Sequence, residues 1–169
     1  MRAQQNIVLI GMPGVGKSTV GVLLAKATSR SFADTDVQIQ VGEGRRLQAL
    51  IDTAGVAAFR ALEERYVLRL ALRGYVIATG GSVVYSERAM AHLSAAGVVV
   101  YLELAFPLLM QRITDLDSRG IVIEQGQSMQ GLFQERRPLY RKYAALTIDC
   151  ASKRADQVVY EIVAALERL

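Results

Sequence analysis

The chain has 169 residues, of which 51% are hydrophobic and 21% are charged, with 14 glycines, 3 prolines and one cysteine. This composition is typical of one globular domain that needs no crosslinks, and the lone Cys150 excludes an internal disulfide. The longest apolar segment, residues 97–110, contains Glu103 and Pro107 and is too short to span a membrane. We therefore expect a single cytoplasmic domain over residues 1–169, with no membrane partner.

The net charge of +4 comes from 20 basic and 16 acidic residues and favours anionic ligands in general. The densest basic group lies in residues 136–142, where a proline, a leucine and a tyrosine interrupt four basic residues. This spacing differs from the tight basic clusters that are typical of nucleic-acid-binding faces. We expect a small anionic partner and no nucleic acid.

Hydrophobic periodicity predicts strands and helices that alternate along the chain. Residues 6–10 form a short apolar run typical of a buried strand in a parallel sheet, and a helical pattern begins at Lys17. We expect further strands at residues 31–33, 75–79, 98–102 and 146–148. We expect further helices at residues 47–52, 55–72, 87–93, 107–114 and 129–143, and a terminal helix that includes residues 158–166. This alternation predicts an α/β fold with a parallel sheet.

Residues 115–130 interrupt this alternation. They mix Asp, Gly, Gln and Ser around a brief apolar run at residues 121–123 and show no clean period. Long irregular segments in otherwise compact domains are usually functional or disordered. We predict a lid in this segment, and an ordinary surface loop is the alternative.

Residues 11–18, GMPGVGKS, match the pattern G-x-x-x-x-G-K-[ST] between a predicted strand and a predicted helix. The glycines allow main-chain N–H groups to converge on phosphate oxygens, and the N-terminus of the following helix adds donors and positive potential. Lys17 supplies a charge for the outer phosphates, and Ser18 supplies a hydroxyl ligand for Mg²⁺. The motif therefore predicts a site for a nucleoside triphosphate.

A phosphate loop alone does not distinguish a GTPase, a motor ATPase and a small-molecule kinase. The sequence has no N/T-K-x-D segment to read guanine, and its 169 residues leave little room for the partner domains of a motor. We therefore expect a small-molecule kinase, which needs an acceptor site beside the γ-phosphate. A non-catalytic ligand sensor on the same scaffold is an alternative that predicts altered phosphate-loop or metal residues.

Two acidic residues follow the strand predicted at residues 31–33. Asp34 and Asp36 are separated by one residue, so in extended backbone both side chains point the same way. In that geometry they share a metal ion, its waters and a substrate hydroxyl. The alternative is that they begin a helix, because Asp is a good N-cap.

Three further groups suit a polyhydroxylated acid. Arg60 and Glu63 are three residues apart on a predicted helix and therefore neighbours, although an exposed ion pair is the alternative. Gly80 and Gly81 follow a predicted strand, where ligands collect in parallel sheets. Arg136 offers a planar guanidinium group to a carboxylate, although an arginine before a proline-containing turn is often on the surface.

The chain resembles the shikimate kinases over its full length. The resemblance rests on five motifs in order, which are the phosphate loop at residues 11–19, F-x-D-x-D at 32–36, F-R-x-x-E at 59–63, T-G-G at 79–81 and E-R-x-P-L-Y at 135–140. It implies a three-layer α/β/α P-loop fold with a five-stranded parallel sheet, a lid at about 115–130 and a helical substrate-binding region at about 35–63. The implied reaction is the ATP-dependent phosphorylation of shikimate to 3-phosphoshikimate, and we also expect a monomer.

The resemblance also implies roles for individual residues on the nucleotide side. ATP and Mg²⁺ are the implied cofactors, with Ser18 and Asp34 at the metal. Arg119 in the lid would approach the transferring phosphoryl group, and Arg112 would lie against adenine. The other implied nucleotide-binding residues are Gly11, Gly14, Val15, Gly16, Lys17, Ser18 and Thr19.

On the acceptor side, the resemblance implies that Asp36 binds ring hydroxyls and acts as the general base, so that Lys17, Asp36 and Arg119 are the catalytic residues. Arg60 and Arg136 would clamp the carboxylate of shikimate. Glu63 would orient Arg60. Main-chain groups would come from Gly80 and Gly81.

Four positions depart from the family pattern. Ser82 stands where a third glycine is usual, and Gly120 follows Arg119 where a proline is usual. Val56 stands where a glutamate is common, and Ile51 where an aromatic residue often lines the pocket. Because three of these four positions touch the acceptor or its cover, a related kinase for another small hydroxy acid is an alternative.

Overall fold

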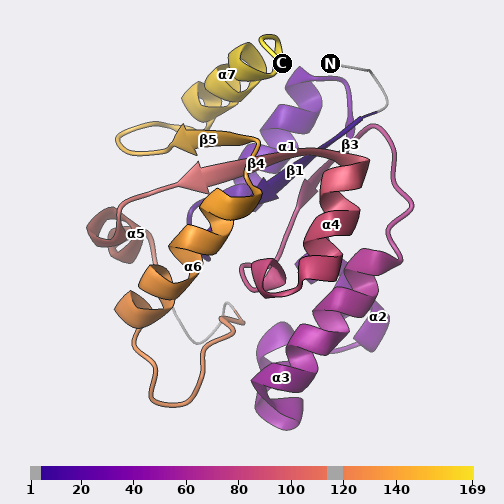
Figure 1. The fold of residues 1–169 in the computed structure, drawn as a ribbon, viewed down its shortest axis with the longest axis vertical. Coiled ribbons are helices and arrows are strands. Elements are labelled where there is room, and N and C mark those ends of the chain that lie inside the picture. Colours follow the sequence, from indigo (N-terminus) through magenta and orange to yellow (C-terminus); the bar gives the residue numbers. More distant parts are fainter. Residues whose placement is uncertain (1–4, 114–119) are drawn as a thin grey trace.

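A computed structural model of the chain describes residues 5–113 and 120–169 as a five-stranded parallel sheet between two layers of helices (Figure 1). The strand order is β2-β3-β1-β4-β5, and Val8 of the central strand lies opposite Ile77 and Val99. The strands are β1 (Asn6–Ile10), β2 (Ser31–Asp34), β3 (Tyr75–Ala78), β4 (Gly97–Glu103) and β5 (Leu146–Asp149). The central strands β1 and β4 are nearly continuous buried apolar runs, as expected for a sheet covered on both faces.

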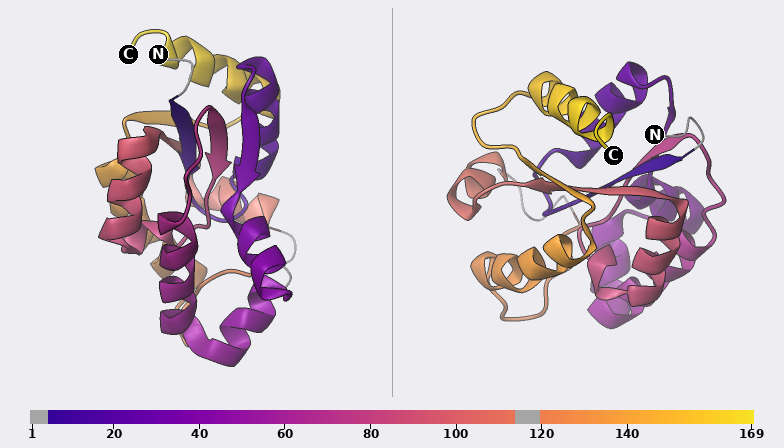
Figure 2. Two further views of the ribbon diagram at one scale, coloured as in Figure 1. Left: turned by 90° about the vertical axis from the view of Figure 1, so that its right-hand side faces the viewer. Right: turned by 45° about the horizontal axis from the view of Figure 1, so that its top comes forward.

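Helices cover the sheet on both faces. Figure 2 shows α1 (Lys17–Ala27) and α7 (Ala155–Leu166) on one face, and α4 (Glu87–Ala96) and α6 (Met129–Tyr143) on the other. Beyond the end of the sheet where the strands finish lie α2 (Thr35–Glu43) and α3 (Leu47–Leu68). The remaining elements are a 3₁₀ turn, η1 (Val83–Tyr85), and α5 (Phe106–Arg112).

The predicted three-layer fold and parallel sheet are confirmed, and strand bounds agree within about one residue at each end. The two helices predicted at residues 47–52 and 55–72 form one helix, α3, which is kinked at Gly55 and ends at Leu68. Gly55 has a φ of 81°, which favours glycine and explains the break in the pattern.

The prediction of extended backbone through Asp36 is wrong. Strand β2 ends at Asp34, and α2 begins at the next residue. Asp34 Oδ1 accepts hydrogen bonds from the main-chain N–H groups of Asp36 at 3.0 Å and Val37 at 3.3 Å. Asp34 is therefore the N-cap of α2, which was the alternative interpretation of the two aspartates.

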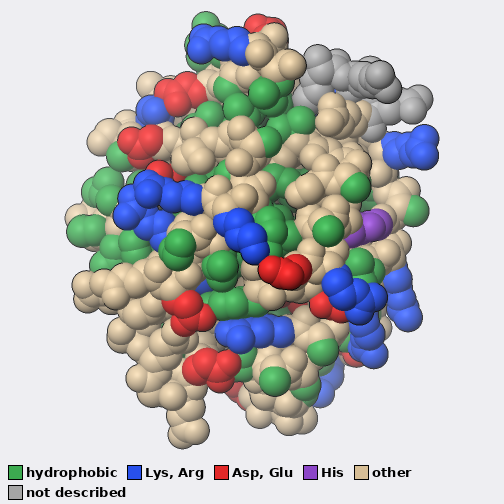
Figure 3. All heavy atoms as spheres, in the orientation of Figure 1, with side chains coloured by type: hydrophobic (Ala, Val, Ile, Leu, Met, Phe, Trp, Pro, Cys, Tyr) green, Lys and Arg blue, Asp and Glu red, His purple; other side chains and the backbone are tan. Residues whose placement is uncertain are grey.

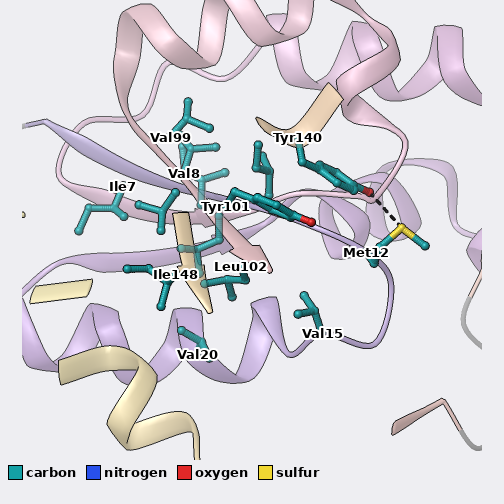
Figure 4. Close-up of a cluster of buried hydrophobic side chains, with 14 of the residues drawn as sticks. Ile7, Val8, Met12, Val15, Val20, Val99, Tyr101, Leu102, Tyr140 and Ile148 are labelled. Carbon is teal, nitrogen blue, oxygen red and sulfur yellow. Dashed lines mark hydrogen bonds between the residues drawn. The ribbon is translucent and has the colours of Figure 1, made fainter. Parts of the chain in front are cut away.

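The main core surrounds β1 and β4 and extends to the phosphate loop (Figure 4). Tyr101 of β4 stacks on Tyr140 of α6, with ring centroids 5.1 Å apart. The hydroxyl of Tyr140 donates to the carbonyl oxygen of Gly81 at 2.7 Å and lies 3.8 Å from the sulfur of Met12. This stack therefore joins α6 to both loops that end at the functional site.

A smaller core lies between α2 and α3. Its buried side chains are Ile39, Leu47, Leu50, Ile51, Phe59 and Val122. Val122 belongs to the segment predicted as a lid, so part of that segment is packed against the helical region. Residues 114–119 lie outside the described residues. The bounds of the lid and of the substrate-binding region stay predictions.

The basic group at residues 136–142 does not form an exposed positive patch. Arg136 is buried, and both Arg137 and Arg141 form ion pairs with Glu103. Lys142 pairs with Glu87 of α4, and Figure 3 shows acidic and basic side chains interspersed on this face. Within residues 5–113 and 120–169, no helix is both long enough and apolar enough to cross a membrane.

Candidate active site

Polar side chains from five parts of the chain line one cavity at the carboxyl ends of β1, β2 and β3. Six of the residues that line this cavity were predicted as site residues: Lys17, Asp36, Glu63, Gly80, Gly81 and Arg136. The other residues that line it are Pro13, Phe59, Ser82, Gly120 and Val122. The parallel sheet therefore brings together residues more than 100 positions apart, at the edge where ligands collect in such sheets.

The phosphate loop connects β1 to α1, and its backbone requires glycine. Gly11, Gly14 and Gly16 have φ values of 145°, 83° and 109°, in a region that other residues rarely adopt. A Cβ atom at Gly11 would lie 2.7 Å from the carbonyl oxygen of Leu102. One at Gly14 would lie 2.6 Å from a side-chain carbon of Ile113. The loop is therefore shaped by its main chain, with no room for side chains at these two points.

Lys17 begins α1 and is buried beneath this loop. Its Nζ donates to the carbonyl oxygens of Gly11 at 2.8 Å and Met12 at 3.0 Å. Burial lowers the pKa of Lys17 to about 8, and the charges of Asp36 and Asp34 oppose that shift. A positive charge that is poorly solvated attracts an added anion strongly, which suits contact with phosphate.

Ser18 and Asp34 are adjacent. Ser18 Oγ donates to Asp34 Oδ2 at 2.6 Å, from the first turn of α1 to the end of β2. A hydroxyl and a carboxylate are hard oxygen ligands of the kind that Mg²⁺ takes together with phosphate oxygens. The two predicted metal ligands are therefore close enough to serve one ion. Thr19, the next residue, is exposed on α1.

Arg112 lies at the end of α5, beside the phosphate loop. Its guanidinium group donates to the carbonyl oxygens of Val15 and Cys150, each at 3.2 Å. It therefore connects the loop to the chain that follows β5. Arg119 lies outside the described residues, and its implied role stays a prediction.

Two carboxyl groups, of Asp36 and Glu63, meet Gly80 on the acceptor side of the cavity. A Cβ atom at Gly80 would lie 2.8 Å from Asp36 Oδ1 and would overlap Glu63 Oε1. Burial raises the pKa of Asp36 to about 6, with a further increase from Asp34 and a decrease from Lys17. Burial raises the pKa of Glu63 to about 7. Both groups therefore change protonation state near neutral pH.

Glu63 is held by Ser82 rather than by Arg60. Ser82 Oγ donates to Glu63 Oε2 at 2.6 Å, and both side chains are buried. Among the described residues, Glu63 has no ion pair with Arg60, so these contacts do not support the prediction that Glu63 orients Arg60. Glu63 Oε1 is buried without a partner among those residues, beside Gly80 in the cavity. This oxygen is available to accept a hydrogen bond from a ligand.

Arg136 and Arg60 approach the cavity differently. Arg136 is 1% exposed, donates to the carbonyl oxygen of Val122, and directs Nη1 to within 3.0 Å of the position of a Cβ atom at Gly81. Arg60 lines an adjoining hollow, keeps 28% of its side chain exposed and lies 3.6 Å from Glu124. Arg136 is therefore the desolvated member of the predicted pair, and Arg60 is the outer member.

Sequence reasoning missed the contacts of three residues that shape this site, and it did not name Thr35 or Tyr85 at all. The hydroxyl of Thr35 accepts from the main-chain N–H of Gly80 at 3.1 Å, and Ser82 fixes Glu63. Tyr85 contacts both arginines. Only Ser82 gave a signal, because it departs from the family pattern. The contacts of Thr35 and Tyr85 join residues 25 to 51 positions apart and leave no local pattern.

Comparisons with known proteins agree with this geometry. A family model described as shikimate kinase matches residues 13–167. The shikimate kinase of Pasteurella multocida is 35% identical over 174 aligned residues, which cover 100% of this chain and 99% of that protein.

Solved structures give the same result. A shikimate kinase from Acinetobacter baumannii in complex with shikimate has a TM-score of 0.90 and 30% identity, and the match covers 98% of this chain and 94% of that one. The shikimate kinase of Aquifex aeolicus has a TM-score of 0.80 and 32% identity, with 96% of each chain covered. The likeness therefore extends over both the phosphate loop and the helices on the acceptor side.

Proposed function

Because the chain belongs to the shikimate kinase family, we propose that it transfers the γ-phosphoryl group of ATP to a hydroxyl group of shikimate, giving 3-phosphoshikimate. The observation that carries the proposal is the cavity in which buried Arg136 lies with Lys17 and Asp36. A carboxylate-binding guanidinium group, a phosphate-binding ammonium group and a candidate base in one small space suit an acidic acceptor of phosphate.

On the nucleotide side, the main-chain N–H groups that residues 11–16 carry, all except Pro13, and the ammonium group of Lys17 hold the phosphates. Ser18 and Asp34 would hold Mg²⁺, supported by their direct hydrogen bond. The ion, when bound, neutralises charge that develops on the phosphate oxygens. Phosphoryl transfer depends mainly on such positioning and charge neutralisation, so no covalent intermediate on the protein is needed.

On the acceptor side, Asp36 accepts the proton of the attacking hydroxyl. Its pKa of about 6 leaves it largely ionised at neutral pH, which is the state a base needs. Glu63 Oε1 accepts a hydrogen bond from a second hydroxyl of the acceptor, and Arg60 and Arg136 bind its carboxylate. These contacts orient one hydroxyl toward the γ-phosphate, which reduces the entropy lost on reaching the transition state.

The proposal is tested by measuring ADP release from the purified protein with ATP, Mg²⁺ and a panel of hydroxylated acids that includes shikimate and gluconate. We expect shikimate to give the highest kcat/KM, and ³¹P NMR to detect a phosphate monoester of shikimate. A higher kcat/KM with another acid would favour the related-kinase alternative. Nucleotide binding without ADP release for any acid would favour the ligand sensor. A cytoplasmic location and a monomeric state stay predictions.

A further inference from the structure

Tyr85 touches both arginines of the acceptor side. It ends η1, the short turn that follows the two glycines after β3. The Arg60 guanidinium carbon lies 3.9 Å from the centroid of its ring, and that of Arg136 lies 5.2 Å from the same centroid. Arg136 Nε also donates to the Tyr85 hydroxyl at 3.3 Å. One side chain therefore contacts two guanidinium groups that come from α3 and α6.

Placing two guanidinium groups beside one ring costs electrostatic energy, which other interactions have to offset. Two like charges beside one ring repel each other, and Arg136 is almost fully removed from water. The face of an aromatic ring attracts cations, which offsets part of this cost. Three carboxyl groups interact with the pair: Glu124 forms an ion pair with Arg60, and the charges of Glu63 and Glu135 act on the arginines. Among the described residues, Glu63 forms no ion pair with either arginine, and one of its oxygens is bonded to Ser82.

The other two carboxyl groups, of Glu124 and Glu135, are exposed to solvent, which screens their attraction to the arginines. Arg60 meets Glu124 at 3.6 Å, and the Glu124 side chain is 56% exposed, so solvent screens this ion pair and it contributes little. Arg60 Nε is buried without a hydrogen-bond partner among the described residues. An incoming carboxylate therefore displaces only the weakly held Glu124 from Arg60, and it gains contacts with two guanidinium groups.

We propose that Tyr85 is a positioning residue that holds Arg60 and Arg136 as a paired receptor for the carboxylate of the acceptor. The proposal rests on the proposed function, because it deepens the account of the same site. The ring fixes Arg60, and the hydroxyl fixes Arg136. Since planar guanidinium groups bind carboxylates through paired hydrogen bonds, their orientation decides how well an acid is preferred over a neutral analogue.

The test compares shikimate with its uncharged methyl ester in the wild type, Tyr85→Leu and Tyr85→Phe. We expect Tyr85→Leu to raise the KM for shikimate about 10-fold while the KM for ATP changes less than about 2-fold. The kcat/KM ratio of acid over ester should fall by a similar factor. Tyr85→Phe keeps the ring and removes the hydroxyl, so it should raise the KM for shikimate by about 3-fold.

Tyr160→Leu is the matched control, because Tyr160 is 75% exposed on α7, which covers the face of the sheet opposite α6. It should leave the KM for shikimate and the acid-to-ester ratio of kcat/KM unchanged. An acid-to-ester ratio that stays the same in Tyr85→Leu would overturn the proposal, because loss of packing alone lowers the rates of both substrates equally. If Tyr85→Leu does not fold, Tyr85→Phe decides, and an unchanged ratio in that variant overturns the proposal.

The test of Tyr85 can fail independently of the test of the proposed function. The wild-type rate with shikimate tests the function, whereas the ratio between variants tests Tyr85. If the wild type prefers another hydroxylated acid, the same ratio is measured with that acid and its ester. A preserved ratio there also counts against Tyr85.

Discussion

The two halves of the active site are built from different parts of the chain. The phosphate half consists of residues 11–18, a continuous segment whose shape is set by main-chain geometry at glycine. The acceptor half takes side chains from α2, α3, the β3–η1 connection and α6. The first half therefore depends on local sequence, and the second depends on how distant helices pack.

This difference has a consequence for specificity. Main-chain donors bind any phosphate chain, so the phosphate half carries little information about the acceptor. The acceptor half consists of buried charges whose positions depend on single contacts, such as the 2.6 Å hydrogen bond from Ser82 to Glu63. Single substitutions there should change which acid is bound while leaving nucleotide binding intact.

The largest effect is expected from Lys17→Ala, in the phosphate half. Loss of the buried ammonium group should lower kcat by at least about 10³-fold, because charge on the transferring phosphoryl group is no longer neutralised. Lys26→Ala, on the exposed side of the same helix, is the control and should keep wild-type turnover. Both are measured by ADP release. Undiminished turnover in Lys17→Ala would contradict the placement of the nucleotide.

Arg136→Ala should give the largest effect in the acceptor half. Removal of one partner from a buried charge pair costs about 2–5 kcal/mol. The Kd for shikimate should therefore rise by about 30- to 4000-fold. Nucleotide affinity should stay within about 2-fold. Calorimetric titration with each ligand separates the two, and Arg137→Ala, an exposed neighbour paired with Glu103, is the control. An equal loss of affinity for shikimate and for the nucleotide would contradict the distinction between the two halves.

Glu63 should make the stability of the ligand-free protein depend on pH. Its pKa is raised to about 7 in the folded protein, so below its ordinary value of 4.5 the group is protonated in both states. As the pH rises from about 4.5 to about 7, the unfolded chain loses this proton before the folded protein does, so the free energy of unfolding should fall by about 3 kcal/mol. Urea denaturation at pH 5 and pH 8 should show most of this fall in the wild type. A fall of the same size in Glu63→Gln would exclude Glu63 as its source.

The smallest effect is expected from Ser82→Ala and Ser82→Gly. Both remove the hydrogen bond to the Glu63 carboxylate, which is worth about 1.5–3 kcal/mol for a charged acceptor. Because the cavity keeps its other groups, we expect about half of that energy to appear as a rise of about 3- to 12-fold in the KM for shikimate. Agreement between the two variants assigns the effect to the hydroxyl. A rise in Ser82→Gly alone would assign it to backbone freedom instead.

The phosphate half could be predicted almost completely from the sequence, because its spacing is local. The glycine pattern, the strand before it and the helix after it all lie within residues 6–27, and each is found where it was expected. The main error was the extended backbone at Asp34 and Asp36. Local sequence does not distinguish a strand end from an N-cap, since Asp suits both.

The acceptor half could be predicted in its residues but not in its contacts. Asp36, Glu63 and Arg136 do line one cavity, yet the partner of Glu63 is Ser82, 19 positions away, rather than Arg60 on the same helix. Helical spacing places Arg60 and Glu63 near each other, but Glu63 is buried and bonded to Ser82, whereas Arg60 is partly exposed and pairs with Glu124. Such differences in burial arise from packing between helices, so the spacing of residues along one helix does not predict them.

A crystal structure of the protein with shikimate and a non-hydrolysable ATP analogue tests the central claim most directly. The account predicts triphosphate oxygens on main-chain N–H groups of residues 11–16 other than Pro13, with the shikimate carboxylate within hydrogen-bond distance of both Arg60 and Arg136. One ring hydroxyl should lie between Asp36 and the γ-phosphate. A shikimate carboxylate bound at Lys17, or an acid held outside the cavity, would contradict the division of the site into these two halves.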